Sequence, residues 1–528
     1  MPALVTDQFR ILNTTSFVDS VNDSSNSYYV FVGLANPTSS GYGRDSSWDT
    51  TTPNPVDNID RLNHYESTML FGKKITDANI RRVIRRIDWT SGLTYEMYRS
   101  DYSILNPSPI TNSLRLYDAD YYVVNSDYRV YICIDNGSSG ISTNGTGSTV
   151  EPTFTDLEPT KLSDGYTWKY LYSISPSDIV KFDTTEYITV PNNWNTSTDS
   201  QISAVRENGD SNVNENQIKK VYIQNQGKGY SIGDGDTAKI VGDGTGGEVS
   251  LSVDGNGKIT NATVISGGSG YTYGMINLGT DPNNLPSTNA ELIPIIPPSK
   301  GHGFDIYEEL GADKVLIYAR FDDSTKDFPI DTKFAQIGIV KNPTVFDSTG
   351  INTTVYSTNE FSALHAMKVN VSSGSLSPGD KIQQTSASGG TTLAYVASYD
   401  ILDEQGNTAV IKYYQDRSLF YNPSTYGHID FTNIGNYYDT NGSILKFEST
   451  SENITKTGGG FSGTIDTGFG GITTTISNKV INLGVVFSSG LANPEINSKS
   501  GDVIYIDNRK TVERNSRQKE DVKIILEF

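Results

Sequence analysis

Short apolar or alternating segments recur along this chain and are separated by polar turns. Each segment is rich in β-branched and aromatic residues and is bounded by Gly, Pro, Asn or Asp, which is the pattern of β-strands joined by loops. The segments are YYVFVGLA (28–35), YYVVNSDYRVYICI (121–134), YTWKYLYSI (166–174), KVLIYARF (314–321), FAQIGIV (334–340), DVIYIDN (502–508) and DVKIILEF (521–528). The pattern predicts a mainly β protein with a few short helices.

One segment has helical spacing instead. In NIRRVIRRIDW (79–89) the apolar residues fall at positions i, i+3, i+4 and i+7, which form one face of an amphipathic helix. These residues are Ile80, Val83, Ile84 and Ile87. The arginines that would fill the opposite face are Arg81, Arg82, Arg85 and Arg86. Thr76 or Asp77 could cap such a helix, so the segment predicts a short helix with a buried apolar face.

Changes in amino-acid composition along the sequence divide the chain into a core and two insertions. Residues 201–298 form a Gly-rich region of short strands, and residues 346–480 form a second one. The proline-rich stretch IPIIPPS (293–299), with Pro297 and Pro298, would form a rigid linker at the end of the first region. We therefore expect a multi-domain, β-sandwich-like core with two small inserted β modules. The core segments would be 1–200, 299–345 and 481–528.

The first module contains a repeated plan. VYIQNQGKGYSIGDG (221–235) and ATVISGGSGYTYG (262–274) both run as a strand, a Gly-x-Gly-Tyr turn and a short return, which predicts a duplicated β-hairpin. The aspartates of the module do not follow the order of an EF-hand loop, so they predict turns in preference to calcium ligands. They are Asp234, Asp236, Asp243 and Asp254.

Composition and charge limit the kinds of molecule that this chain could bind. Aromatic residues make up 10% of the chain, which argues for a folded protein. The formal net charge of -20 would repel nucleic-acid phosphates and anionic membranes. Beside the four arginines only Lys73 and Lys74 add positive charge. We therefore expect the arginines to pair with acidic groups of this chain or of partner proteins, and not with nucleic acid.

No pattern points to catalysis, to a cofactor or to a metal. Cys133 is the single cysteine, which excludes an internal disulfide and a thiolate zinc site within one chain. The histidines, which are His64, His302, His365 and His428, lack the spacing of a metal motif. Neither a Gly-x-Ser-x-Gly elbow nor a phosphate loop occurs. The N-terminal segment has no signal-peptide pattern and no apolar run approaches about 18 residues, so we expect neither signal-directed export nor membrane insertion.

A series of ordered motifs resembles one protein family. The motifs are YYVFVGLANP (28–37), Trp48, TPNPVDN (52–58), RRVIRRIDW (81–89), DGYTWKYLYSISP (164–176), TTEYITVP (184–191), FAQIGIVKNP (334–343), SGDVIYIDNR (500–509) and KEDVKIILEF (519–528). In this order they resemble the baseplate wedge proteins encoded by gene eight of T-even-like contractile-tailed phages (myoviruses). Arg86, Asp88 and Trp89 stand at matching positions, whereas Arg85 stands where members of the family have proline. Residues 201–297 and 346–480 have little counterpart in its shorter members.

The resemblance implies a structural virion protein that is not an enzyme. It would be a wedge subunit of the tail baseplate, made in the cytoplasm of the bacterial host, with roles in baseplate assembly and in its rearrangement when the tail contracts. Implied partners are other wedge proteins, a second copy in a homodimer, and tail fibre components. Candidate structural or interface residues are Arg81, Arg82, Arg85, Arg86, Asp88, Trp89, Trp168 and Tyr170.

Two other functions stay open at this point. The Tyr-, Gly-, Asn- and Ser-rich modules also suit a carbohydrate-binding tail adhesin or a tailspike-type protein. A polysaccharide-degrading enzyme with two catalytic carboxylates is a weaker alternative, because no pair of the 61 acidic residues stands out and long regular β-helix repeats are missing from the sequence.

Overall fold

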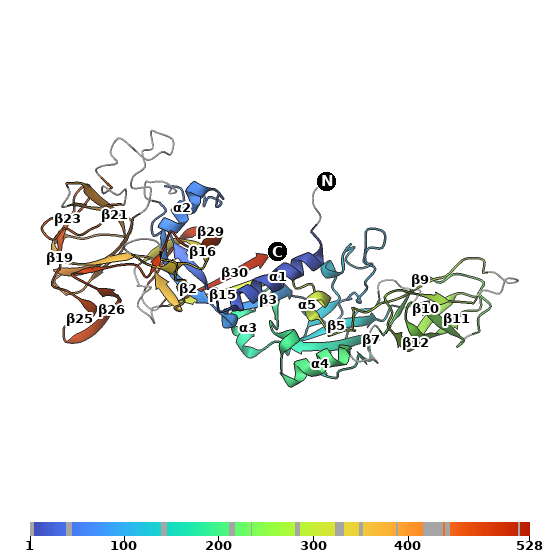
Figure 1. Cartoon of the computed structure of the whole chain (residues 1–528). Coiled ribbons are helices and arrows are strands. Elements are labelled where there is room, and N and C mark those ends of the chain that lie inside the picture. Colours follow the sequence, from blue (N-terminus) through green and yellow to red (C-terminus); the bar gives the residue numbers. More distant parts are fainter. Residues whose placement is uncertain are drawn as a thin grey trace. The chain divides into compact units, whose positions relative to one another are not determined.

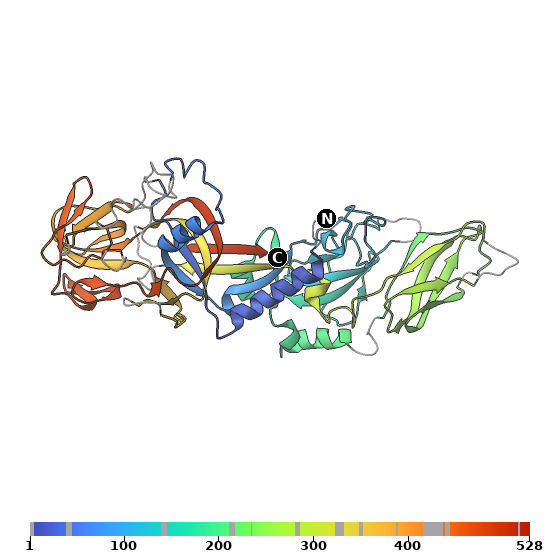
Figure 2. The same cartoon turned by 45° about the horizontal axis from the view of Figure 1, so that its top comes forward.

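A computed structural model describes residues 5–38, 45–138, 145–210, 217–233, 235–279, 286–322, 332–347, 352–386, 389–415, 437–438, 444–515 and 518–528. The chain forms two compact units. Unit 1 comprises Met1–Val18, Arg81–Leu316 and Ile524–Phe528, and unit 2 comprises Asp19–Ile80 and Ile317–Lys523. The boundaries fall within α1 (Asp7–Asn22), β3 (Ile80–Arg85), β15 (Lys314–Phe321) and β30 (Glu520–Glu527). The elements of each unit can be followed in Figures 1 and 2.

The core of unit 1 lies on an antiparallel sheet in the order β4-β5-β7-β6. The strands are β4 (Tyr122–Val124), β5 (Arg129–Asn136), β6 (Thr160–Lys161) and β7 (Tyr166–Ser173). β5 and β7 pair from Arg129↔Ser173 to Asn136↔Tyr166. Their aromatic and β-branched residues suit strands and supply large buried side chains, and they form one core cluster with Trp194.

A second sheet has the order β30-β15-β3-β8, with β8 at Tyr187–Val190. Short helices follow the strands of unit 1, and each begins where a polar side chain can cap it. The Ser175 side chain accepts from the Asp178 N–H at the start of α3 (Pro176–Phe182). Asp305 caps α5 (Ile306–Glu309) in the same way. α4 (Ser200–Asp210) and most of α1 also belong to unit 1.

The Gly-rich region of unit 1 forms two further sheets. β9 (Val221–Asn225) pairs with β14 (Glu291–Pro294), and a four-stranded sheet has the order β12-β11-β10-β13. Its strands are β10 (Thr237–Gly242), β11 (Thr245–Val253), β12 (Ile259–Ser269) and β13 (Gly274–Asn277). Alternate residues of β10 and β11 are buried, as expected for sheets with one face against a core.

The prediction of a duplicated hairpin is wrong, because β9 pairs with β14 and β12 pairs with β11. Neither Gly-x-Gly-Tyr turn therefore joins two paired strands. The turns nevertheless share a backbone conformation in the left-handed region that glycine tolerates. The φ values are 65° at Gly227, 82° at Gly229, 61° at Gly268 and 74° at Gly270. The sequence repeat thus encodes a turn shape, and contacts with distant strands decide the pairing.

Three of the four module aspartates accept backbone N–H groups in turns or at strand ends. Asp236 accepts from Gly233, Asp243 from Thr272 and Asp254 from Asn256. Asp234 and the histidine His428 lie outside the described residues.

Unit 2 contains a five-stranded sheet in the order β18-β2-β1-β16-β29. The strands are β1 (Tyr28–Gly33), β2 (Met69–Ile75), β16 (Lys333–Lys341), β18 (Glu360–Ser362) and β29 (Asp502–Glu513), and α2 (Ile59–Ser67) precedes β2. All residues of β1 are buried, which fits its central position. Gly72 in β2 lets the Phe361 ring lie against the backbone, since a Cβ there would be 2.3 Å from the ring.

Unit 2 also contains a closed six-stranded barrel. Its order is β22-β21-β20-β23-β24-β19, and the pairing of β19 with β22 closes it. The strands are β19 (His365–Gly374), β20 (Lys381–Thr385), β21 (Thr391–Ile401), β22 (Thr408–Tyr414), β23 (Ile454–Lys456) and β24 (Phe461–Ile465). Shorter pairings are β27 (Leu491–Ala492) on β19, β25 (Gly471–Ile476) with β26 (Lys479–Phe487), and β17 (Thr344–Val345) with β28 (Ile496–Asn497). Apolar side chains from all six strands fill the barrel.

The structure confirms a mainly β, multi-domain fold. Every predicted strand segment contains a strand, namely β1, β4 with β5, β7, β15, β16, β29 and β30. The division into core and inserted modules stays a prediction. In the part of the chain that the structure describes, no helix has the length and apolar character needed to cross a bilayer.

Candidate interaction site at the arginine strand

The arginine-rich segment is a strand, so the predicted helix at 79–89 is wrong. Asp77–Asn79 make a single 3-10 turn, and Ile80–Arg85 form β3. β3 pairs with β8 through Arg82↔Val190 and Arg85↔Tyr187. The apolar spacing resembled that of a helix because the strand is covered on both faces, so its apolar residues do not alternate. Arg82, Val83 and Ile84 are all buried. β-branched residues favour the extended backbone, and pairing with β8 completes that preference.

Of the four arginines in this segment, Arg82 is the buried one, with 2% of the residue exposed. Its guanidinium donates to the Asn192 carbonyl at 2.9 Å, and its backbone N–H donates to the Asn192 side chain at 3.0 Å. The guanidinium carbon lies 4.1 Å from the centre of the Tyr307 ring. A buried cation needs such partners, so Arg82 serves the interior of unit 1.

Arg81 and Arg86 are half-buried and pair with carboxylates. Arg81 lies 3.0 Å from Asp178, in the first turn of α3. Arg86 contacts Asp183 at 2.6 Å and Asp88 at 2.9 Å. The hydrogen bond to Asp88 raises the pKa of Arg86 above its ordinary value, with the charges of both aspartates adding to it against the effect of burial. Both arginines are thus held within the chain.

Asp88 and Trp89 attach the end of this segment to β4. The Trp89 N–H donates to the Val124 carbonyl at 2.9 Å, and its indole N–H donates to Ser148 at 3.1 Å. The Asp88 side chain is 56% exposed while it pairs with Arg86. Asp88 is therefore the end of this cluster that solvent can reach.

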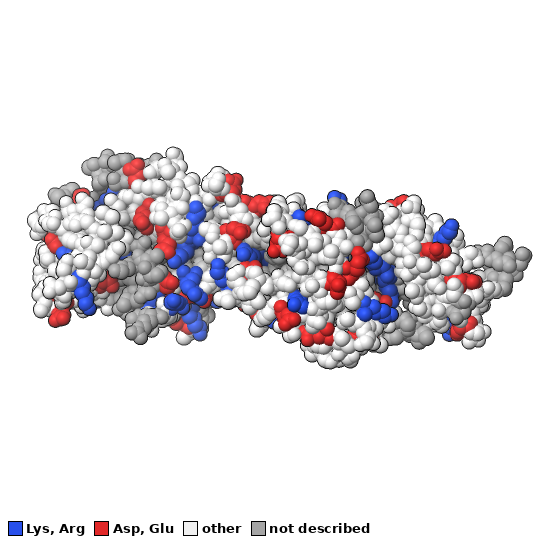
Figure 3. Space-filling view, turned by 90° about the horizontal axis from the view of Figure 1, so that it is seen from below, with Lys and Arg blue, Asp and Glu red and all other residues white. Residues whose placement is uncertain are grey.

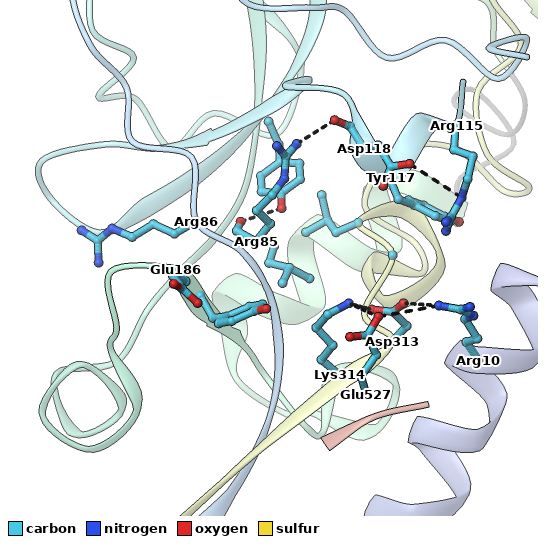
Figure 4. A pocket seen from close by; sticks show the side chains of 15 residues that line it. Arg10, Arg85, Arg86, Arg115, Tyr117, Asp118, Glu186, Asp313, Lys314 and Glu527 are labelled. Atoms are coloured by element: carbon cyan, nitrogen blue, oxygen red, sulfur yellow. Dashed lines mark hydrogen bonds and ion pairs between the residues drawn. The ribbon is translucent and has the colours of Figure 1, made fainter. Parts of the chain in front are cut away.

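Arg85 is the most exposed of the four arginines, with 43% of its side chain accessible. It pairs with Asp120 at 2.8 Å and donates to the Ala119 carbonyl at 2.9 Å. It lines a cavity of about 500 Å³, whose lining side chains are drawn in Figure 4. Of the four arginines, Arg85 is thus the one best placed to meet a partner.

The walls of this cavity carry both signs of charge (Figure 4). Arg10 and Lys314 both approach Glu527, at 3.7 and 3.3 Å. Lys314 also contacts Asp313 at 2.8 Å. On the opposite side Arg115 lies 4.0 Å from Asp118. Since carboxylates balance these cations, the cavity suits a polar polypeptide surface better than a phosphate group.

Trp168 and Tyr170 belong to the core of unit 1. Trp168 is fully buried and stacks on Tyr166 with ring centres 5.4 Å apart. Tyr170 is 1% exposed and meets Tyr131 edge-on at 5.8 Å. Both side chains are therefore positioned to stabilise the β5–β7 sheet and are out of reach of a partner.

Sequence reasoning missed a group of buried polar side chains beside this sheet. Lys169, between Trp168 and Tyr170, is 3% exposed and donates to the Leu157 carbonyl at 2.6 Å and to Asn208 at 2.8 Å. His302 and Glu309 are also buried and lie 2.5 Å apart. The sequence contained a sign of these groups, because Lys169 stands within a predicted strand that is otherwise rich in aromatic residues. Within the described ranges no group of three or more His, Cys, Asp or Glu could hold a metal ion.

Basic side chains do not form one continuous field on the face shown in Figure 3, where Lys and Arg lie interspersed with Asp and Glu. The arginines at 81–86 are also paired with acidic groups, because Arg81, Arg85 and Arg86 each contact an aspartate. The segment therefore uses its positive charge for ion pairs within unit 1.

Comparison with known proteins shows a similarity to a phage baseplate protein. The chain is 24% identical over 219 residues to the baseplate wedge protein gp8 of Enterobacteria phage T4. The match covers 36% of this chain and 60% of that protein, which is less than two thirds of the relative's length. No family model matches the sequence.

Proposed function

We propose that this chain is a structural protein of a contractile phage tail, located in the baseplate of the virion. The observation that carries the proposal is the similarity to a baseplate wedge protein over 219 residues. The ordered sequence motifs point the same way. Such a protein acts through surfaces and not through a catalytic cleft.

The site geometry is in keeping with this function. Arg81, Arg82 and Arg86 are engaged by groups of unit 1, and the ion pairs of Arg81 and Arg86 hold this segment against α3 and the loop after it. Arg85 and the mixed-charge cavity remain accessible. An accessible arginine next to paired charges is typical of a polar protein interface, in which arginine often supplies much of the affinity.

The finer proposal concerns partners and assembly. The chain would be a wedge subunit that binds other wedge proteins, pairs with a second copy, and contacts tail fibre components. It would take part in baseplate assembly and in its rearrangement on tail contraction. It would be made in the host cytoplasm and would need no enzyme activity, cofactor, nucleic acid or membrane.

Purified tails provide the test. Quantitative mass spectrometry of tails from the phage that encodes the chain should detect it at a fixed ratio to other baseplate proteins. Deleting its gene should stop the assembly of complete baseplates, and a plasmid copy should restore it. Normal tails without the chain would refute the proposal.

The carbohydrate-binding alternative gains no specific support from the structure. Sugar sites commonly use exposed aromatic rings as platforms. Among the described residues of 201–298, Tyr273 is the exposed aromatic side chain, at 63%. We therefore keep the baseplate protein as the proposed function.

A further inference from the structure

The loop between Tyr98 and Tyr121 carries two aliphatic residues at its tip. Ile104 is 78% exposed and Leu105 is 92% exposed, which makes Leu105 the most exposed large apolar side chain in the described part of the chain. The backbones of Ser103 and Asn106 pair at 3.0 and 3.1 Å on either side of them. Tight turns usually place Gly, Asn, Asp or Ser at such positions. A local departure of this kind is typical of a functional position.

The tip is held in place by charged side chains beneath it. Arg99 is 2% exposed, binds Asp101 through two hydrogen bonds of 2.9 and 2.6 Å, and lies 3.9 Å from the Tyr222 ring. Asn106, at the end of the turn, donates to the same Asp101 carboxylate at 2.6 Å. The turn is therefore anchored to the interior of unit 1.

A second anchor fixes the rest of the loop. Glu96 is 1% exposed, and its carboxylate accepts from the N–H groups of Thr111 at 3.0 Å and Asp120 at 2.8 Å. Ser108 also donates to it. A loop held in this way loses little conformational entropy when its tip is bound. The apolar tip is thus preorganised for contact.

The flank of the loop is acidic. Arg115 contacts both Asp7 and Asp118. Tyr117 donates to the Glu308 carbonyl at 2.6 Å, and the Glu308 side chain accepts from Gln8 at 3.3 Å. Asp7 and Asp118 therefore pair with the Arg115 guanidinium, and with Glu308 this flank carries three carboxylates and one guanidinium. A second copy would bring the same acidic flank and a net charge of -20, so like charges would oppose self-association here.

We propose that the Ile104–Leu105 tip is a docking knob that inserts into an apolar pocket flanked by Lys or Arg on a different protein subunit. The inference rests on the proposed function, because that subunit would be a neighbouring protein of the same tail. Apolar side chains buried at the centre of an interface supply much of its affinity, and the acidic flank selects a basic partner.

The experiment is complementation of a phage that lacks this gene. Plasmids supply the wild-type chain, the double variant Ile104→Ser/Leu105→Ser, or the matched control Val180→Ser, which removes an aliphatic side chain that is 79% exposed on α3. Purified variants should unfold at the wild-type temperature, since the changed side chains are exposed. We expect at least tenfold less of the double variant in purified tails and less than a twofold change for the control. Wild-type incorporation of a folded double variant would overturn the inference.

Two further measurements test the nature of the partner. Asp118→Lys, which reverses a flank charge that is 58% exposed, should lower incorporation severalfold if the partner is basic, and an unchanged level would overturn that assignment. Sedimentation of purified wild-type and double-variant chains should give the same oligomeric state. A dimer that becomes monomeric in the double variant would show instead that the knob binds a second copy. Absence of the wild-type chain from tails would refute the proposed function itself, and the inference with it.

Discussion

Lys169 gives the fold a pH dependence whose size can be worked out. The residue is 3% exposed, and burial lowers the pKa of Lys169 from 10.5 to about 8, although the charges of Glu309 and Glu158 oppose the shift. A lysine that holds its proton less tightly in the folded state favours unfolding while both states are protonated. At one pKa unit per 1.36 kcal/mol the cost is about 3 kcal/mol below pH 8. The wild-type protein should therefore become more stable as the pH rises from 8 toward 10.5.

The measurement compares the wild-type chain with Lys169→Met. Between pH 7 and pH 9 the linkage relation gives a gain of about 1 kcal/mol for the wild type relative to the variant. Urea unfolding followed by tryptophan fluorescence reports mainly on unit 1, which contains Trp89, Trp168 and Trp194. Lys161→Met, which removes an exposed lysine of β6, is the control and should keep the wild-type pH profile. The free energy of unfolding of the wild type minus that of Lys169→Met should therefore increase from pH 7 to pH 9, and a value that stays constant or falls over this range would refute the reasoning.

Three further predictions concern packing and charge. Arg82→Ala should lower the free energy of unfolding by about 3 kcal/mol in urea titrations, because it removes a charged hydrogen bond and leaves the Asn192 carbonyl without it. Gly72→Ala should lower the melting temperature, since its Cβ would lie 2.3 Å from the Phe361 ring, whereas Gly255→Ala meets open space and should not. Arg85→Ala removes an ion pair that is 43% exposed and should change stability by less than about 1 kcal/mol. A large loss for Arg85→Ala, or none for Arg82→Ala, would contradict the burial of these residues.

Strands were predictable from sequence where local preference and burial agree. The segment YTWKYLYSI is aromatic and β-branched, and Tyr166–Ser173 is a strand. The same reasoning failed at Ile80–Arg85 because spacing alone cannot distinguish a helix from a strand that is covered on both faces. It also failed at the Gly-x-Gly-Tyr turns, where the turn shape is local but the pairing partners β11 and β14 lie elsewhere in the sequence.

The candidate site was predictable only in part. The sequence indicated that the arginines would meet acidic groups, and Asp178, Asp120 and Asp183 are such groups within the chain. It could not assign Arg82 to the interior and Arg85 to the surface, because that difference depends on Asn192 and Tyr307 reaching one side chain and not the other. The sequence also did not predict the exposed Ile104–Leu105 tip, because two adjacent apolar residues are as compatible with a buried position as with an exposed one.

The sequence by itself determined the strand content, the aromatic core segments and the similarity to a baseplate protein, because propensity and ordered motifs are properties of neighbouring residues. The tertiary structure alone decided that β19 and β22 close a barrel, that Lys169 is buried and that Leu105 is exposed. These features arise from contacts between residues far apart in the chain. Their free energy depends on how much surface each contact removes from water, and that is settled only when the strands have paired.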